Sequence, residues 1–212
     1  DYAVRFGMGA IKGVGANAVD TIVQNRKDGK YKSIFDVAKK IDLRAANKKA
    51  FESLALAGGF DGFGDTHRAQ YFHDEGDGIT FLEKAVKYGA KFQENENSSQ
   101  VSLFGDASDV QIPEPIVPPC EEWNTMEKLA KEKEVVGIYI SGHPLDDYKY
   151  EMKYFCNTKL EHLKELNAFV GKNVSIGGII TKIEHRTAKN GKGWAMFTLE
   201  GYDESYDFRI FG

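Results

Sequence analysis

The sequence predicts a mainly α-helical protein with a smaller β part at its C-terminal end. Apolar residues at helical spacing, such as Ala18, Val19 and Ile22, mark the first half of the chain. From Asn173 onward the apolar residues alternate instead with polar ones, which is the pattern of half-buried strands. Between these regions lies a stretch rich in Pro, Asn and acidic residues, which predicts a linker.

Residues 1–92 read as helices separated by glycine-marked turns. Ser33 begins a short helix, and Asp36 three residues later resembles a capping box. Asn47 is the expected cap of the next helix, which ends at 58–59, where two glycines occur. We expect further helices over about 66–75 and 80–92.

Residues 93–122 change to Glu, Asn, Ser, Gln and Pro, with prolines at 113, 115, 118 and 119. Such a composition has little capacity to bury itself, so an acidic linker is predicted here. Helical periodicity resumes over 123–141, where 141–144 ends the helix with a Gly and a Pro. We interpret 123–168 as a connecting helix and a mixed segment. The apolar stripe expected for this helix consists of Met126, Leu129, Lys133, Val136 and Ile140.

The β pattern covers 169–212. A strand is expected over 174–176, followed by a bulge at Gly177-Gly178 and a continuation over 179–184. Asn190-Gly191 is typical of a hairpin turn. Two further strands follow, one over Ala195, Phe197 and Leu199, the other over Tyr206, Phe208 and Ile210. Three strands do not close a barrel, so the sheet is expected to be part of an incomplete domain.

Charge is distributed unevenly along the chain, although the net charge is only −4. Residues 1–60 carry 11 basic residues against 6 acidic ones, and 170–193 carry 5 against 1. Residues 93–127 carry no Lys or Arg and 8 acidic residues. Two basic zones therefore flank an acidic connector, which is compatible with nucleic-acid binding despite the acidic mean.

Several functional classes find no support in the sequence. The longest apolar runs are too short to span a membrane, and two cysteines make no metal or disulfide framework. His143 before Pro144 fits a turn residue better than a base or a ligand, and Cys156 has no evident base partner. We therefore expect no catalytic residues, no metal site and no cofactor in this chain.

The most informative motif is Lys12-Gly13-Val14-Gly15, which leads directly into a helix. An apolar-x-Gly-apolar-Gly pattern is typical of a helix-hairpin-helix element. Its glycines let the backbone approach a phosphate, and the helix start adds N–H groups and a favourable dipole. Contacts of this kind reach the sugar-phosphate backbone and are independent of base sequence. The alternative is a plain glycine turn between packed helices.

A second motif, Gln100-Val101-Ser102-Leu103-Phe104, lies inside the acidic linker. Peptides of this type dock into the groove of a sliding clamp, where Leu103 and Phe104 would serve as apolar anchors and Gln100 as a hydrogen-bonding group. The alternative is a chance match, with Leu103 and Phe104 packing on their own domain.

A third candidate is the basic β-loop with Arg186, Lys189 and Lys192 beside Trp194. Cationic loops next to aromatic sheet faces bind single-stranded nucleic acid by charge and stacking. Phe197 and Phe208 are the candidate stacking rings, and Trp194 and Phe208 are compatible with either face of the sheet. The alternative is a solvated basic hairpin.

Taken together, the chain resembles the C-family replicative DNA polymerases, the family of the bacterial DNA polymerase III alpha subunits. The resemblance is collinear over nearly the whole chain, and 132–145 is its most specific stretch. The other matching segments are 6–15, 35–37, 47–49, 56–61, 178–181 and 189–200.

The resemblance implies a tandem helix-hairpin-helix module that grips primer-template duplex, with Lys48 and Lys49 beside the first hairpin. It implies that Gln100, Leu103 and Phe104 bind the beta sliding clamp, and that 169–212 begins an OB-fold near the single-stranded template. Other replicase subunits in the cytoplasm are further implied partners. The parent enzyme would be a polymerase using Mg²⁺ in a palm domain absent from this chain.

Two points depart from the family pattern: residues 201–207 lack its usual acidic-Gly turn, and the second hairpin at 57–61 is looser than the first. Two other interpretations remain at this point. One is a stand-alone helix-hairpin-helix and OB adaptor in DNA repair. The other is a structural spacer whose glycine turns contact no phosphate.

Overall fold

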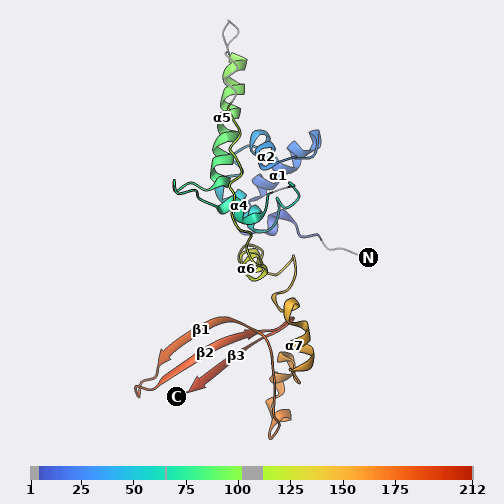
Figure 1. Cartoon of the computed structure of the whole chain (residues 1–212), viewed down its shortest axis with the longest axis vertical. Coiled ribbons are helices and arrows are strands. Elements are labelled where there is room, and N and C mark those ends of the chain that lie inside the picture. The colour runs from blue at the N-terminus through green and yellow to red at the C-terminus, as the bar shows by residue number, and fades with distance from the viewer. Residues whose placement is uncertain (1–4, 65, 102–111, 212) are drawn as a thin grey trace. The chain divides into compact units, whose positions relative to one another are not determined.

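The computed structural model describes residues 5–64, 66–101 and 112–211, with the side chains of 28 and 97–101 excepted. The chain divides into two compact units, Asp1–Ile140 and Ser141–Gly212 (Figure 1). The first consists of helices and the second contains a three-stranded sheet. This confirms the predicted fold class, mainly α with a smaller β part. Within the described residues, no helix is long and apolar enough to cross a membrane.

The helical unit contains eight helical elements in its described part, several of which begin at a side-chain cap. Ser33 accepts a hydrogen bond from the Asp36 N–H, and Asn47 accepts one from the Ala50 N–H, as predicted. In chain order the elements are η1 (Met8–Ala10), α1 (Ala16–Asn25), η2 (Arg26–Asp28), α2 (Ile34–Lys40), α3 (Lys48–Leu56), α4 (Arg68–Phe72), α5 (Phe81–Val101) and α6 (Thr125–Val136).

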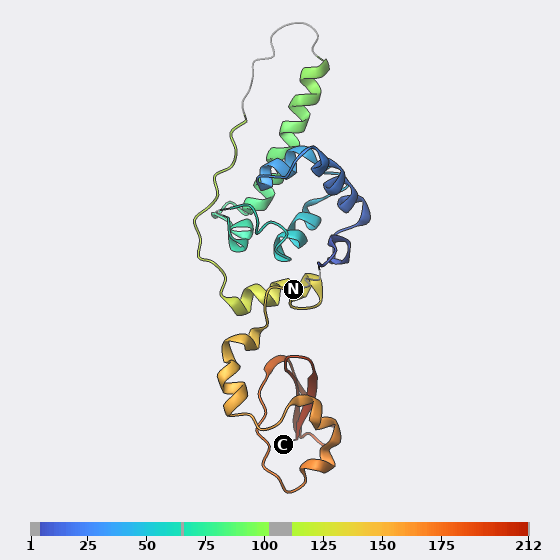
Figure 2. The ribbon, with the colours of Figure 1, turned by 90° about the vertical axis from the view of Figure 1, so that its right-hand side faces the viewer.

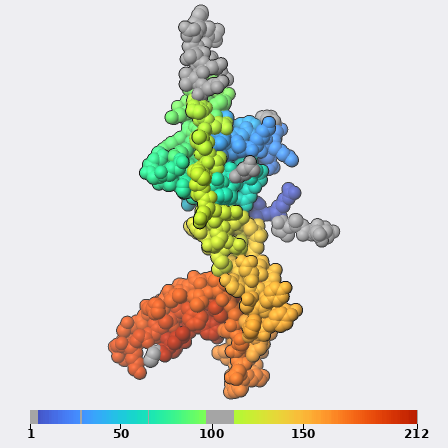
Figure 3. Space-filling view, in the orientation of Figure 1, coloured from blue at the N-terminus to red at the C-terminus, as the bar shows by residue number. Residues whose placement is uncertain are grey.

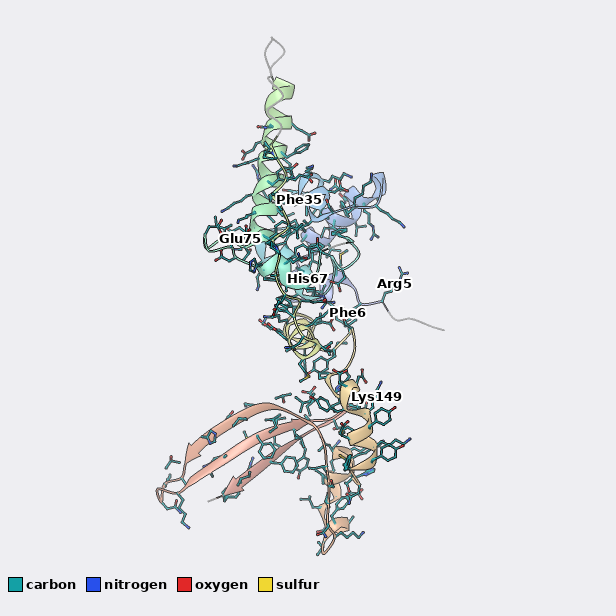
Figure 4. All side chains as sticks on the ribbon, in the orientation of Figure 1. Arg5, Phe6, Phe35, His67, Glu75 and Lys149 are labelled. Atoms are coloured by element: carbon teal, nitrogen blue, oxygen red, sulfur yellow. The ribbon has the colours of Figure 1, made fainter. Side chains whose placement is uncertain are left out.

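The core of this unit forms where α2 crosses α5. Phe35 on α2, labelled in Figure 4, makes edge-to-face contacts with two rings of α5. Its ring centroid lies 5.8 Å from that of Phe81 and 5.6 Å from that of Tyr88. Gly89 permits the close approach, because a Cβ at this position would lie 2.5 Å from the Cβ of Ala38. The crossing therefore tolerates only glycine at 89 without displacement of a helix.

Helix α5 is longer than predicted, since it runs to Val101 where a linker was expected from residue 93. Figure 1 shows it projecting beyond the other helices of its unit. Gln93 gives a physical reason for the continuation. Its amide Nε2 donates to the carbonyls of Ala38, Lys39 and Ile41, at 2.8–3.2 Å, around the end of α2. The polar composition after residue 92 predicted a linker. Gln93, the first of these polar residues, instead attaches α5 to the end of α2 and so supports the continuation of the helix.

The segment 112–124 is extended but packed, which differs from the free linker that its prolines suggested. Pro118 is fully buried, and its carbonyl accepts a hydrogen bond of 2.9 Å from the Gln70 side chain. Glu114 forms an ion pair of 2.7 Å with Lys39. Figures 2 and 3 show the segment running along the helices of the unit. Backbone carbonyls and prolines can thus cover a helical surface without regular structure.

Helix α6 belongs to the helical unit and ends earlier than predicted. It stops at Val136, because Gly137 adopts a left-handed conformation with φ of 86°. The predicted stripe was right at Leu129 and Val136, which are buried, and wrong at Met126, which is partly exposed. The buried side of the helix carries Leu129, Glu132, Val135 and Val136.

The second unit places three short helical elements beside an antiparallel sheet of order β1-β2-β3. The helical elements are η3 (Pro144–Tyr148), α7 (Lys149–Tyr154) and η4 (Leu160–Phe169), and the strands are β1 (Ile179–Thr187), β2 (Gly193–Glu200) and β3 (Ser205–Phe211). His143 is the N-cap of η3, which confirms its role as a turn residue.

The sheet departs from prediction at its start. Residues 174–176 form no strand, because the Ser175 carbonyl accepts hydrogen bonds from the N–H groups of Asn157 and Thr158 rather than from a strand. The register irregularity lies between Ile180 and Lys182 instead of at the predicted glycines. The third strand is confirmed, with Phe208 directly opposite Phe197.

Candidate nucleic-acid interface

The first glycine hairpin forms a tight turn between η1 and α1. The Val14 N–H donates to the Ile11 carbonyl at 3.0 Å, and both side chains are buried. Gly13 has φ of 89°, a conformation that favours glycine. Gly15 is the N-cap residue of α1, whose start lacks a side-chain cap. The turn therefore presents backbone rather than side chains where the helix begins.

Helix α3 packs against this turn. A Cβ at Gly13 would lie 2.9 Å from Ser53 Oγ and 3.4 Å from Lys49 Cγ. The missing side chain thus lets the turn settle on α3 and brings Lys49 next to Lys12 and Gly13. Sequence reasoning named both lysines, and the fold brings Lys49 beside Gly13, the residue that follows Lys12 in the chain.

Several backbone N–H groups at the turn are available for a ligand. Within the described residues, no hydrogen bond uses the N–H of Gly13, Gly15 or Ala16. The N–H groups of Lys12 and Val14 are engaged within the protein: that of Val14 donates to the Ile11 carbonyl, and that of Lys12 donates to the Val135 carbonyl at the end of α6, at 2.8 Å. Free N–H groups at the positive end of a helix dipole form an anion site.

The three lysines predicted for this region differ in their surroundings. Lys12 is exposed, and Lys49 is largely exposed, with only Glu52 at 3.8 Å. Lys48 instead pairs with Glu83 on α5 at 2.7 Å, and this hydrogen bond raises the pKa of Lys48. Its charge is already matched within the protein. Lys12 and Lys49 are therefore less neutralised by the protein than Lys48.

At the second hairpin, 57–61, a side chain of the protein itself fills the space beside the glycine. Gly58 has φ of 80°, and the Arg68 guanidinium fills the space beside it, so that a Cβ would lie 2.1 Å from Arg68 Nη2. Arg68 also donates to the Leu56 carbonyl at 3.1 Å and to Asp61 through Nε and Nη2. A protein arginine thus occupies the space beside Gly58 that a phosphate would need to enter.

Arg68 is held by two carboxylates, neither of which sequence reasoning found. Glu132, fully buried on α6, accepts from Arg68 Nη1 at 3.0 Å, and Asp61 accepts from the other side. Burial alone would lower the pKa of Arg68, but the hydrogen bonds to Asp61 and Glu132 raise it. The arginine is therefore fully charged inside the unit. The only hint in the sequence is a Glu three residues after Leu129 on a helix.

The aromatic residues of the sheet lie on two faces. Ile183, Phe197 and Phe208 pair directly across the three strands, and the Phe197 and Phe208 rings stack at 5.1 Å. Trp194 and Phe211 also pair directly, three positions along their strands from Phe197 and Phe208. Because side chains alternate between the faces of a sheet, these two rings lie on the opposite face, with centroids 6.0 Å apart. The face of Trp194, left open by the sequence, is thus separate from that of Phe208.

The predicted basic loop is only partly free. Arg186 lies over the Trp194 ring at 5.5 Å and pairs with Glu184, which also binds Lys182 at 2.6 Å. Lys189 and Lys192, at the hairpin turn, have no ion pair within the described residues. The loop therefore offers two free cations beside a ring that already has a cation over its face.

The predicted clamp peptide cannot be placed. Gln100 lies in the last turn of α5, and Leu103 and Phe104 lie outside the described residues. Among the residues that the structure describes, no group of three or more His, Cys, Asp or Glu side chains could hold a metal ion.

Comparison with known proteins agrees with the hairpin geometry. Residues 1–71 match the model of a family described as helix-hairpin-helix motif. The chain is 37% identical over 215 residues to DNA polymerase III subunit alpha of Campylobacter jejuni, which covers 99% of this chain. The chain is a homologue of part of DNA polymerase III subunit alpha. The subunit from Mycobacterium tuberculosis is 34% identical over 93% of the chain, and that from Treponema pallidum 33% over 98%.

The match covers only a segment of these relatives. The chain spans 17% of the length of the C. jejuni and T. pallidum subunits and 16% of the M. tuberculosis subunit. The alignments extend over both units of this chain.

Proposed function

We propose that this chain positions DNA for a replicative polymerase by gripping the sugar-phosphate backbone at its first hairpin. The observation that supports it best is the free N–H groups of Gly13, Gly15 and Ala16 beside Lys12 and Lys49. They combine an anion-binding helix start with two cations, and none of them can distinguish bases. The grip is therefore independent of sequence.

The second hairpin has no part in this grip. Asp61 places a carboxylate on that turn, and Arg68 occupies the space beside Gly58. The Asp61 carboxylate and a phosphate are both negative and repel each other. The two hairpins of the tandem therefore have different roles. The first binds DNA, and the second anchors the helices that support the first.

Three finer functions belong to the same proposal. Gln100, Leu103 and Phe104 bind a sliding clamp as a short anchored peptide, which keeps the polymerase at the primer end by effective concentration. The sheet with Lys189 and Lys192 contacts single-stranded template. The whole polymerase performs nucleotidyl transfer with Mg²⁺ held by residues outside this chain. Alignment with polymerase subunits over both units favours this function over a stand-alone repair adaptor.

The hairpin is tested by fluorescence anisotropy with two duplexes of equal length and unrelated sequence over a series of salt concentrations. We expect equal affinities and a steep loss with salt, since each phosphate contact contributes a slope of about −0.9 in log K against log salt. Lys12→Gln should reduce the magnitude of this slope by about 0.9, the contribution of one phosphate contact. Lys91→Gln, which removes one exposed charge from α5, is the control and should leave the slope unchanged. Salt-independent binding would support a structural spacer instead.

The clamp contact is tested separately by calorimetry with a bacterial sliding clamp. We expect a dissociation constant on the order of micromolar, typical of a short peptide. The double variant Leu103→Ala/Phe104→Ala should abolish the heat of binding. If the folded chain binds no clamp, this part of the proposal falls and the DNA grip stands.

A further inference from the structure

An apolar cleft opens in the helical unit between η1, the last turn of α1 and the second hairpin. Its volume is about 510 Å³, within the usual range for ligand pockets. The floor consists of Ile22, Val37, Leu54 and Phe60, which are among the most buried residues of the unit. The cleft thus reaches the core itself, and whatever fills it must be apolar.

One wall of the cleft is aromatic. The rings of Phe60 and Phe63 stack with centroids 5.7 Å apart and planes inclined by 15°. Tyr31 closes the neighbouring side, and its hydroxyl donates to the Ile22 carbonyl at 2.8 Å, which fixes the ring. A preformed wall of this kind favours binding of a bulky apolar side chain, because the wall loses little conformational entropy on binding.

The charged residues at the cleft all have the same sign. Arg26 and Lys30 line it, and no carboxylate does. Neither cation takes part in an ion pair with any residue that the structure describes, and the nearby Asp36 is paired with Lys40 at 2.8 Å. An incoming group therefore meets two positive charges that pair with no carboxylate among the described side chains, around an apolar floor. Charge complementarity favours an acidic ligand.

This combination favours a peptide over DNA. In duplex DNA the bases are stacked, so only phosphates would meet the cations and the apolar floor would stay empty. The cleft comes close to the phosphate-binding turn through Met8 of η1, but α1, about 15 Å long with its ten residues, separates the cation Arg26 at its end from Gly13. We propose that the cleft docks an acidic peptide of a partner protein, with one aromatic or leucine side chain placed on the floor between Ile22 and Phe60.

The probe is a fluorescein-labelled peptide of nine residues, made of Asp, Ser and Gly around one central Phe, titrated with the whole chain in an anisotropy assay. We expect saturable binding that weakens at least tenfold when Ser replaces the Phe. It should weaken similarly when Asn replaces every Asp, since anchor and charge act together.

The protein variants separate the two contributions. Arg26→Gln/Lys30→Gln should weaken the acidic peptide at least tenfold and leave the neutral Asn peptide unchanged. Phe63→Ser should weaken both. The matched control, Lys87→Gln/Lys91→Gln, removes the same charge from α5, away from the cleft, and should have no effect.

Duplex DNA is the competing ligand in the last arm. If the cleft is a peptide site, an excess of duplex leaves the peptide bound, and Arg26→Gln/Lys30→Gln retains the salt slope of DNA binding. Two results together would assign Arg26 and Lys30 to the DNA surface and overturn the inference. They are displacement of the peptide by duplex and, in that variant, an equal loss of affinity for the peptide and for the duplex. Equal binding of the Phe and Ser peptides would also overturn it. The DNA grip at Lys12 is unaffected by either result.

Discussion

Arg68 Nη1 lies 3.0 Å from Glu132 Oε2, although 64 residues separate them along the chain. Arg68 closes the second glycine turn, and Glu132 lies on α6, whose Val135 carbonyl accepts the Lys12 N–H of the first turn. Each hairpin is therefore hydrogen-bonded to α6, the second through Glu132 and the first through the Val135 carbonyl. This explains why a helix expected to be a connector is part of the helical unit.

Removing one side of this buried pair should be costly. Glu132→Ala leaves the Arg68 charge with Asp61 alone, so the free energy of unfolding of the helical unit should fall by roughly 3–5 kcal/mol. Urea unfolding followed by circular dichroism measures it. Glu134→Ala, at an exposed position of the same helix, should change the value by about 0.5 kcal/mol at most. A loss of equal size in both variants would mean that the buried pair is not responsible.

A second prediction concerns the space that Arg68 fills. Gly58 and Gly64 both have positive φ, 80° and 74°, but a Cβ at Gly64 meets nothing within 4 Å. Gly64→Ala should therefore cost only the backbone strain, about 1 kcal/mol. Gly58→Ala must also displace the guanidinium, which adds roughly 2 kcal/mol or more. Thermal unfolding of the two variants compares them directly, and equal losses would show that Arg68 moves aside freely.

Local features of the fold were predictable from sequence because they depend on neighbouring residues. The caps at Ser33 and Asn47 satisfy N–H groups three residues away. The turn at Gly13 needs a residue with positive φ followed by a helix start. Strand β3 shows its alternation within seven residues. Each of these patterns contains its own physical cause.

The rest depended on contacts between distant segments. Nothing near Arg68 indicates a partner at Glu132, and a stripe drawn through Met126 and Lys133 placed α6 in the wrong orientation. Residues 93–101 have the composition of a linker, yet Gln93 finds three carbonyls at the end of α2. Polar residues are read correctly only when their partners are known.

The different surroundings of two adjacent lysines give a third prediction. Lys49→Gln should weaken duplex binding more than Lys48→Gln, because the Lys48 ammonium is held 2.7 Å from Glu83. Glu83→Gln should release Lys48 and tighten binding at low salt, with a larger salt slope. Anisotropy titrations of the three variants at two salt concentrations provide the comparison. If Lys48→Gln has the greater effect, Lys48 exchanges Glu83 for phosphate and the assignment is reversed.

The last prediction concerns pH and the start of η3. The Asp146 carboxylate accepts from the His143 N–H at 2.8 Å, which lowers the pKa of Asp146, with Lys149 at 3.3 Å acting in the same direction. A folded pKa below the unfolded one, about 3.9, means that the stabilisation is complete above that value. It is lost as the pH falls through the lower folded value.

The contribution of Asp146 can be isolated by comparing the chain with Asp146→Asn, using Trp194 fluorescence in a Trp123→Phe background to follow urea unfolding. The difference in midpoint should be constant near neutral pH and shrink toward zero in acid, because a protonated Asp then resembles Asn. Asp147→Asn, at the exposed neighbouring position, is the control and should show a smaller difference. A difference that persists unchanged in acid would mean that the shape of the cap matters, and its charge does not.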